Sequence, residues 1–152
     1  DTWLTDDVVR TVSRNFRTLP APSGWAVMGI STGGYCAARL ALDHPGTFTA
    51  AAALAPDNPA HGVRCPLWLA RTTRPAVRLL VESSAQDRES PPKFADWISD
   101  AVRAPGTVST LRIDSGGHNW KTWSRMFPAA LTWLSGRIEA PRAVPLAASA
   151  AP

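Results

Sequence analysis

The sequence predicts an α/β protein whose mostly parallel sheet lies between two layers of helices. The first observation is that short apolar runs, typical of buried strands, alternate along the chain with longer stretches of helical period. The second is Gly29-Ile30-Ser31-Thr32-Gly33, which stands where a predicted strand passes into a predicted helix. The chain has 152 residues, of which 45% are hydrophobic, and this is enough for one sizeable core.

The first half of the chain supplies helices and strands in alternation. Valines recur at helical spacing close to two aspartates, which favour the start of a helix. Pro45-Gly46 ends the next helix, and the apolar runs on either side of it predict strands buried on both faces. The expected elements are a helix over about 5–16, a strand over 25–30, a helix over 34–44 and a strand over 50–54.

The second half continues the alternation after an interruption. Residues 56–75 are rich in proline and arginine without a clear period, so we expect a long irregular excursion that covers the active site. The expected elements that follow are a strand over 77–81, a helix over 91–102, a strand over 108–113 and a helix over about 120–138. The tail, 139–152, is biased to Ala, Pro and Ser and is expected to be disordered, so the predicted domain covers 1–138.

Composition and charge limit the classes of partner. The formal charge of +4 comes from arginines scattered singly along the chain, so no specific nucleic-acid site is expected. Cys36 and Cys65 have neither metal-ligand nor redox spacing, so the sequence predicts no metal and no cofactor. The two cysteines form either a disulfide or two buried thiols, and Cys36 is expected to be a small buried side chain in a helix. No apolar run could span a bilayer and no signal pattern is present. The first residue is Asp1, and we interpret the chain as the later part of a longer protein.

Ser31 is the candidate nucleophile. It is the centre of a G-x-S-x-G pattern in the strand-to-helix context where this pattern forms a tight, strained turn. The turn aims the hydroxyl into the site and is expected to leave no room for side chains at Gly29 and Gly33. The alternative is a helix N-cap serine without chemistry. The glycine spacing and the lysine of nucleotide-binding loops are absent, so a nucleotide site is not expected.

His118 is the candidate general base. A serine hydroxyl needs a base to take its proton, and histidine changes charge near neutral pH. His44 ends the helix that begins at the nucleophile, which places it about 20 Å away at ~1.5 Å per residue. His61 lies in the irregular excursion, either as an exposed loop residue or as a substrate contact. His118 follows the last strand behind two glycines, which let its imidazole reach towards Ser31.

Asp87 is the candidate acid that orients the base. Hydrolases with this turn place serine, acid and histidine in that chain order, and Asp87 lies just past the strand at 77–81. It can also be read as a surface carboxylate paired with the neighbouring arginine. Asp57, after the preceding strand, is the rival position, whereas Asp114 is so close to His118 in sequence that we expect it to shape that loop.

Three blocks of the sequence resemble the esterase D family of α/β-hydrolases, which also includes mycolyltransferases and enterochelin-type esterases. The blocks are Asn15-Phe16-Arg17-Thr18-Leu19 leading to Gly29-Ile30-Ser31-Thr32-Gly33-Gly34-Tyr35, then His44-Pro45-Gly46-Thr47-Phe48, and Gly117-His118-Asn119-Trp120 with Trp123. The resemblance implies an α/β-hydrolase fold. Family domains have several more strands before the nucleophile, so the chain resembles the C-terminal half and lacks the N-terminal strands. Ala55-Pro56-Asp57-Asn58 departs from the small-residue turn usual in the family, which keeps Asp57 open as the acid.

The resemblance implies a serine esterase that works through an acyl-enzyme. Ser31 would be the nucleophile, Asp87 the acid and His118 the base, with the backbone N–H of Thr32 in the oxyanion hole and Trp120 at the substrate. The substrate would be a small-molecule or lipid ester. The second oxyanion donor would come from the upstream part of the parent chain, which we also expect the sheet to need because its edge is otherwise uncovered.

The sequence leaves two other functions open. An acyltransferase of the mycolyltransferase type would use the same residues and pass the acyl group to a second alcohol, and a non-catalytic module would keep the fold without using the site. An extracytoplasmic or secreted location is implied by the resemblance alone. The sequence makes no prediction of oligomeric state.

Overall fold

The computed structural model describes residues 2–138, in which four strands form one parallel sheet of order β1-β2-β3-β4. The predicted α/β fold class is therefore confirmed. The strands are β1 (Ala26–Ile30), β2 (Ala50–Leu54), β3 (Arg78–Ser84) and β4 (Thr107–Ile113). The helices of this part of the chain are η1 (Trp3–Val8), α1 (Val9–Asn15), α2 (Thr32–Asp43), α3 (Pro66–Thr72), α4 (Lys93–Ala101) and α5 (Trp120–Ser135).

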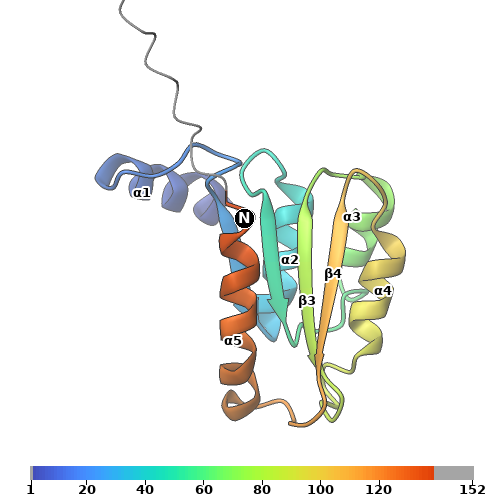
Figure 1. Cartoon of the computed structure of the whole chain (residues 1–152). Coiled ribbons are helices and arrows are strands. Elements are labelled where there is room, and N and C mark those ends of the chain that lie inside the picture. Colours follow the sequence, from blue (N-terminus) through green and yellow to red (C-terminus); the bar gives the residue numbers. More distant parts are fainter. Residues whose placement is uncertain (1, 139–152) are drawn as a thin grey trace, which may run out of the picture.

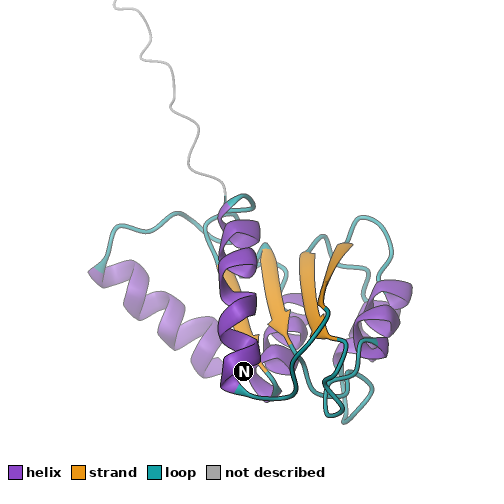
Figure 2. Ribbon diagram, turned by 60° about the horizontal axis from the view of Figure 1, so that its bottom comes forward, coloured by secondary structure: helices purple, strands orange, loops and turns teal. Residues whose placement is uncertain are grey.

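Helices cover both faces of the sheet and give three layers (Figure 1). Because side chains alternate along a strand, Ala51 and Leu79 face the cluster built with α2, α3 and α4. Their neighbours Ala52 and Leu80 face the opposite cluster, which is built with Met126 of α5. Figure 2 shows α5 lying across one face of the sheet, with α2, α3 and α4 on the other face and the N-terminal helix to the side. The predicted three-layer arrangement is thus present.

The central strand β2 consists almost wholly of alanine, and every one of its residues is buried. Small side chains on both faces let helices approach the sheet closely from either side. All strands are parallel, so their carboxyl ends meet at one edge. The loops that leave this edge carry the residues of the candidate site.

The structure differs from the predicted elements mainly in the excursion at 56–75, which contains the helix α3 (Pro66–Thr72). This helix has seven residues and a proline at its first position, where proline is well tolerated. Its buried Leu67 and Leu69 are too few to establish a period among the surrounding prolines and arginines. β3 also runs three residues beyond the predicted end, to Ser84.

The expectation for Cys36 was wrong. Cys36 is exposed, Cys65 is buried, and both are free thiols. The buried side of α2 is made by other small residues, among them Ala37 and Ala41, and Cys36 lies on the solvent side. Whether a residue of this helix is buried therefore depends on the side of the helix on which it lies.

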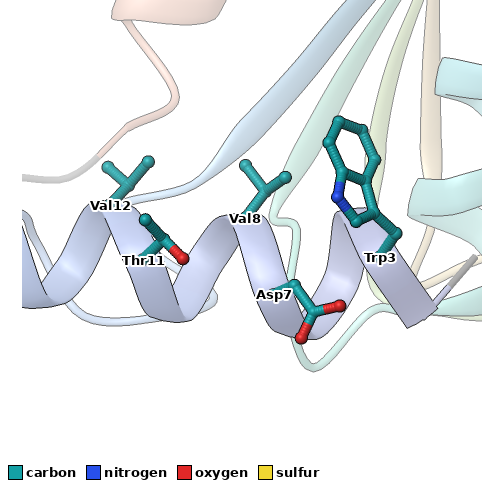
Figure 3. A pocket seen from close by; sticks show the side chains of 5 residues that line it. All are labelled: Trp3, Asp7, Val8, Thr11 and Val12. Atoms are coloured by element: carbon teal, nitrogen blue, oxygen red, sulfur yellow. The ribbon is translucent and has the colours of Figure 1, made fainter.

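The N-terminal helix carries an apolar side of its own. Trp3, Val8 and Val12 project from the same side of it (Figure 3). Trp3 is 67% exposed and lies at a shallow pocket of about 280 Å³ on this helix. Within residues 2–138, no helix combines the length and apolar character that a membrane crossing requires. The predicted disordered tail, 139–152, lies outside the described residues.

Candidate active site

Ser31 occupies the sharp turn between β1 and α2. Its backbone has φ 54° and ψ −123°, a conformation that residues with a side chain rarely adopt. Two backbone hydrogen bonds hold the turn: Ser31 N–H donates to Leu54 O over 2.9 Å, and Ser31 O accepts from Tyr35 N–H over 3.0 Å. The strain is therefore sustained by β2 on one side and by the first turn of α2 on the other.

The glycines of this turn have different roles. A Cβ on Gly29 would lie 2.1 Å from the carbonyl oxygen of Gly33, closer than any real contact. A Cβ on Gly34 would lie 3.0 Å from Leu54 O, which is tight but less severe. A Cβ on Gly33 would meet nothing within 4 Å among the described residues. The expectation that the turn excludes side chains thus holds at Gly29 and was wrong at Gly33.

His118 lies between β4 and α5 and reaches the serine. Its Nε2 is 2.7 Å from Ser31 Oγ, and its Nδ1 is 2.8 Å from Asp87 Oδ2. A neutral imidazole with its proton on Nδ1 can donate to the carboxylate and accept from the hydroxyl at these distances. Only 10% of the His118 side chain is exposed. The next residue, Asn119, caps α5 by accepting a hydrogen bond from Thr122 N–H over 3.1 Å.

Asp87 lies in the loop after β3, and its side chain is fully buried. Its Oδ2 faces His118, while its Oδ1 accepts from the backbone N–H groups of Glu89 and Ser90 over 3.0 and 2.9 Å. These charge-assisted hydrogen bonds replace the water that burial removes. The alternative interpretation as a surface carboxylate does not fit a group buried in this way.

Asp57, the rival acid, contacts the nucleophile instead of the histidine. Its Oδ1 lies 3.3 Å from Ser31 Oγ, and its Oδ2 accepts from the Thr32 hydroxyl over 2.6 Å. Its backbone N–H also donates to Ser31 O over 3.3 Å. The structure therefore brings together Ser31, His118 and Asp87 in one hydrogen-bonded chain and adds a second carboxylate on the serine.

Comparison with known proteins identifies the family. The family model described as "Putative esterase" matches residues 1–134. The chain belongs to this esterase family. No curated protein matches the sequence.

Solved esterase and hydrolase structures resemble the fold of this esterase-family chain. An S-formylglutathione hydrolase from Agrobacterium tumefaciens superposes with a TM-score of 0.73 at 18% identity, covering 91% of this chain and 57% of that one. A ferulic acid esterase gives 0.72 at 16% identity, covering 91% and 61%. A fluorophosphonate-binding serine hydrolase from Staphylococcus aureus gives 0.67 at 20% identity, covering 84% and 60%. The chain thus spans about three fifths of the length of these relatives.

Other predicted residues of the esterase-family chain lie around the turn. Thr32 is the first residue of α2, so its N–H is among those that have no acceptor within the helix. Trp120 is 64% exposed, and its ring contacts those of Trp123 and Phe127 at centroid distances of 6.4 and 5.9 Å. His44 ends α2, as expected. His61 is exposed and borders a pocket described below.

Sequence reasoning missed three supporting groups of this site. Trp123 packs edge-on against the His118 ring at 5.0 Å between centroids, which restricts rotation of the imidazole. Ser90 donates its hydroxyl to Pro56 O over 2.7 Å and so joins the loop of Asp87 to the loop after β2. The contact of Asp57 with Ser31 was also unforeseen. Trp123 stood in one of the blocks that resemble the esterase family, and Ser90 follows an aspartate by three residues, which is typical of a turn that binds backbone N–H groups.

Burial changes the ionisation of two nearby side chains. Glu82 of β3 is 2% exposed, and burial raises its pKa from 4.5 to about 7. Its Oε2 has no hydrogen-bond partner among the described residues. The pKa of Tyr35 is raised mainly by burial and further by the two thiols, while Arg39 opposes the shift. The Tyr35 phenol therefore remains protonated at neutral pH, and it donates to His61 O over 2.7 Å.

Proposed function

We propose that this protein is a serine esterase that hydrolyses carboxylic esters through an acyl-enzyme. The observation that carries the proposal is the continuous hydrogen-bonded chain from Ser31 Oγ through the His118 ring to the buried Asp87. The strained turn at Ser31 supports it, because strain of this kind is stored where a nucleophile must be aimed. Membership of an esterase family supports the same reaction.

The first half-reaction is acylation. Ser31 Oγ attacks the ester carbonyl carbon while its proton passes to His118 Nε2, and Asp87 stabilises the imidazolium that results. The tetrahedral intermediate then collapses: the bond from the carbonyl carbon to the leaving oxygen breaks, and His118 returns the proton to the leaving alcohol. In the second half-reaction water attacks the acyl-enzyme by the same route and releases the acid.

The oxyanion of the intermediate requires preorganised donors. Thr32 N–H at the start of α2 is well placed to be one of them, because the helix dipole favours negative charge there. We assign the second donor to the upstream part of the parent protein, since the related structures are longer than this chain. Trp120 is assigned to the substrate side because its side chain is exposed and it lies two residues after His118.

Hydrolysis is preferred to acyl transfer because the family and the similar structures are named for hydrolysis. A small-molecule or lipid ester is the expected substrate. Secretion stays a prediction from resemblance.

The test is covalent labelling with a fluorophosphonate probe, followed by mass spectrometry of the labelled peptide. A structural relative is named for binding this class of probe. We expect an adduct on Ser31 that is lost in Ser31→Ala and reduced at least about 1,000-fold in rate in His118→Ala and Asp87→Asn. The matched control is Asp100→Asn, which removes an exposed carboxylate near the end of α4 and should label normally.

The test is made on this chain and on a longer form of the protein that includes upstream sequence. Absence of label in both forms, with folding verified by circular dichroism, would refute the esterase proposal and favour a non-catalytic module. Label in the longer form alone would support the upstream position of the second oxyanion donor.

A further inference from the structure

A second carboxylate, Asp57, touches the nucleophile, and the esterase mechanism does not use it. Its Oδ1 lies 3.3 Å from Ser31 Oγ, and its Oδ2 is held by the Thr32 hydroxyl at 2.6 Å. Backbone hydrogen bonding to Ser31 O fixes the residue from a third direction. Asp57 is therefore anchored beside the reacting atoms, and the inference drawn from it rests on the proposed function.

A fixed anion at this place opposes the reaction of a neutral ester. The transition state places negative charge on the carbonyl oxygen next to Thr32 N–H, and the Thr32 side chain is itself bonded to Asp57. Like charges a few ångströms apart repel, and the repulsion is stronger where water is excluded. A positive group on the substrate, lying against Asp57, would turn this repulsion into attraction.

The space for such a group is a pocket of about 190 Å³ next to Asp57. Its lining residues are Thr32, Tyr35, Asp57, Asn58, His61 and Gly62. Among these described residues there is no lysine or arginine to neutralise the carboxylate. The volume is below the roughly 300–1,000 Å³ of pockets for drug-sized ligands, so the occupant is a small group.

Two of the other polar groups of the pocket are already engaged. The Tyr35 hydroxyl donates to His61 O over 2.7 Å, and Asn58 Oδ1 accepts from Ala60 N–H over 3.0 Å. This leaves Asp57 Oδ1 as the charged acceptor that faces a ligand at the nucleophile. A small cation with N–H donors complements it in charge and in hydrogen bonding.

The position of the pocket indicates which part of the ester enters it. The leaving alcohol must lie at His118 Nε2 to receive its proton, whereas the pocket is bordered by Thr32 and the loop after β2. The pocket therefore takes the acyl part. An ammonium nitrogen on the α carbon lies about 2.5 Å from the carbonyl carbon, so in the acyl-enzyme it comes within reach of an oxygen that is 3.3 Å from Ser31 Oγ.

We propose that the substrates are esters whose acyl group carries an ammonium group next to the carbonyl, as in amino-acid esters, and that Asp57 binds this group. The ammonium keeps its proton throughout. The bonds that form and break are those of the esterase reaction, so Asp57 is a specificity residue and takes no part in proton transfer.

The test compares two p-nitrophenyl esters of equal size, those of L-alanine and isobutyric acid, which differ by an ammonium in place of a methyl group. kcat/KM is measured at about pH 6.5, where an α-amino group is largely protonated. In Asp57→Asn we expect kcat/KM to fall for the alanine ester and to rise for the isobutyrate ester, because removal of the anion relieves repulsion. The ratio of kcat/KM for the alanine ester to kcat/KM for the isobutyrate ester should drop by about tenfold or more. Asp100→Asn, at an exposed carboxylate of α4, is the control and should leave the ratio unchanged.

Comparing the ratio of the two kcat/KM values between the unmodified protein and Asp57→Asn cancels the intrinsic reactivity of each ester. Equal loss on both esters would mean that Asp57 only supports the turn, and an equal gain would mean that it only repels the oxyanion; either result overturns the proposal. The same preparations are labelled with fluorophosphonate. If Ser31 is labelled but the ratio of the two kcat/KM values does not change in Asp57→Asn, the esterase proposal stands and the role of Asp57 is refuted. If there is neither label nor turnover, both proposals are refuted.

Discussion

At the scale of single residues, the site depends on one strained conformation. Ser31 is held at φ 54° although it has a side chain, and its hydroxyl thereby meets His118 at 2.7 Å. Asp87 is fixed in position by hydrogen bonds from two backbone N–H groups. Such a strained conformation persists only where the surrounding backbone permits no other. Within this turn the backbone approaches most closely at Gly29, where a Cβ would lie 2.1 Å from Gly33 O.

Gly29→Ala and Gly33→Ala should therefore differ sharply. The methyl group of Gly29→Ala would collide with the backbone of Gly33, so we expect misfolding or a fluorophosphonate labelling rate at least about 100-fold lower. The methyl group of Gly33→Ala has open space and lies in a helix, where alanine is favoured by about 0.5–1 kcal/mol. Urea unfolding and labelling rates test both. Similar behaviour of the two variants would contradict this account of the turn.

At the scale of elements, β3 places an ionisable side chain, Glu82, in the core. Glu82 faces the side of the sheet that α5 covers, because it is two residues from Leu80 in the same strand. Burial raises its pKa to about 7. The native state thus holds a proton that the unfolded chain releases above about pH 4.5.

The sign of the pH dependence follows from this difference. The stability linked to Glu82 is fully present below about pH 4.5 and is lost as the pH rises through about 7. At about 1.4 kcal/mol per unit of pKa, the full loss is on the order of 3–4 kcal/mol, most of it between pH 5 and about 8. Urea unfolding between pH 5 and about 8 should show this fall, and Glu82→Gln should remove it, because an amide does not ionise. Glu89→Gln, at an exposed glutamate, is the control and should retain the fall.

At the scale of the whole molecule, the sheet is unevenly covered. All residues of β2 are buried, whereas all five residues of β1 are only partly buried and β1 lies at an edge of the sheet. The strand that leads to the nucleophile is thus the less protected one. Trp3 and Phe16 of the N-terminal region are also exposed, at 67% and 69%. We propose that the upstream part of the parent protein covers this edge, as the greater length of the similar structures suggests.

Hydrogen exchange tests this proposal. In this chain the amides of β2 and β3 should exchange slowly, and those of β1 should exchange faster by at least about tenfold, because unpaired edges open more readily. In a longer form with upstream sequence, protection of β1 should rise to that of β2. Equal protection of β1 in both forms would show that the edge is stable uncovered.

The sequence by itself determined the class of fold and pointed to side chains that the structure brings together. Apolar runs and helical periods have distinct spacings, so Ala50–Leu54 could be assigned as a strand with its observed bounds. Ser31 and His118 could be chosen because a strained strand-to-helix turn and a glycine-rich loop after a strand leave local signatures. Chain order limited the acid to a carboxylate between Ser31 and His118, a condition that both Asp57 and Asp87 satisfy.

Only the tertiary structure decided how the carboxylates divide their roles. Asp57 and Asp87 both follow a buried strand, and nothing in their local sequence tells which one meets the histidine. The structure places Asp87 on His118 and Asp57 on Ser31. Asp87 follows β3, which pairs with the strand before His118, and Asp57 follows β2, which pairs with the strand before Ser31. The exposure of Cys36 and the open space at Gly33 were likewise decided by the tertiary structure. Contacts between residues far apart in the chain depend on packing, which a local pattern does not encode.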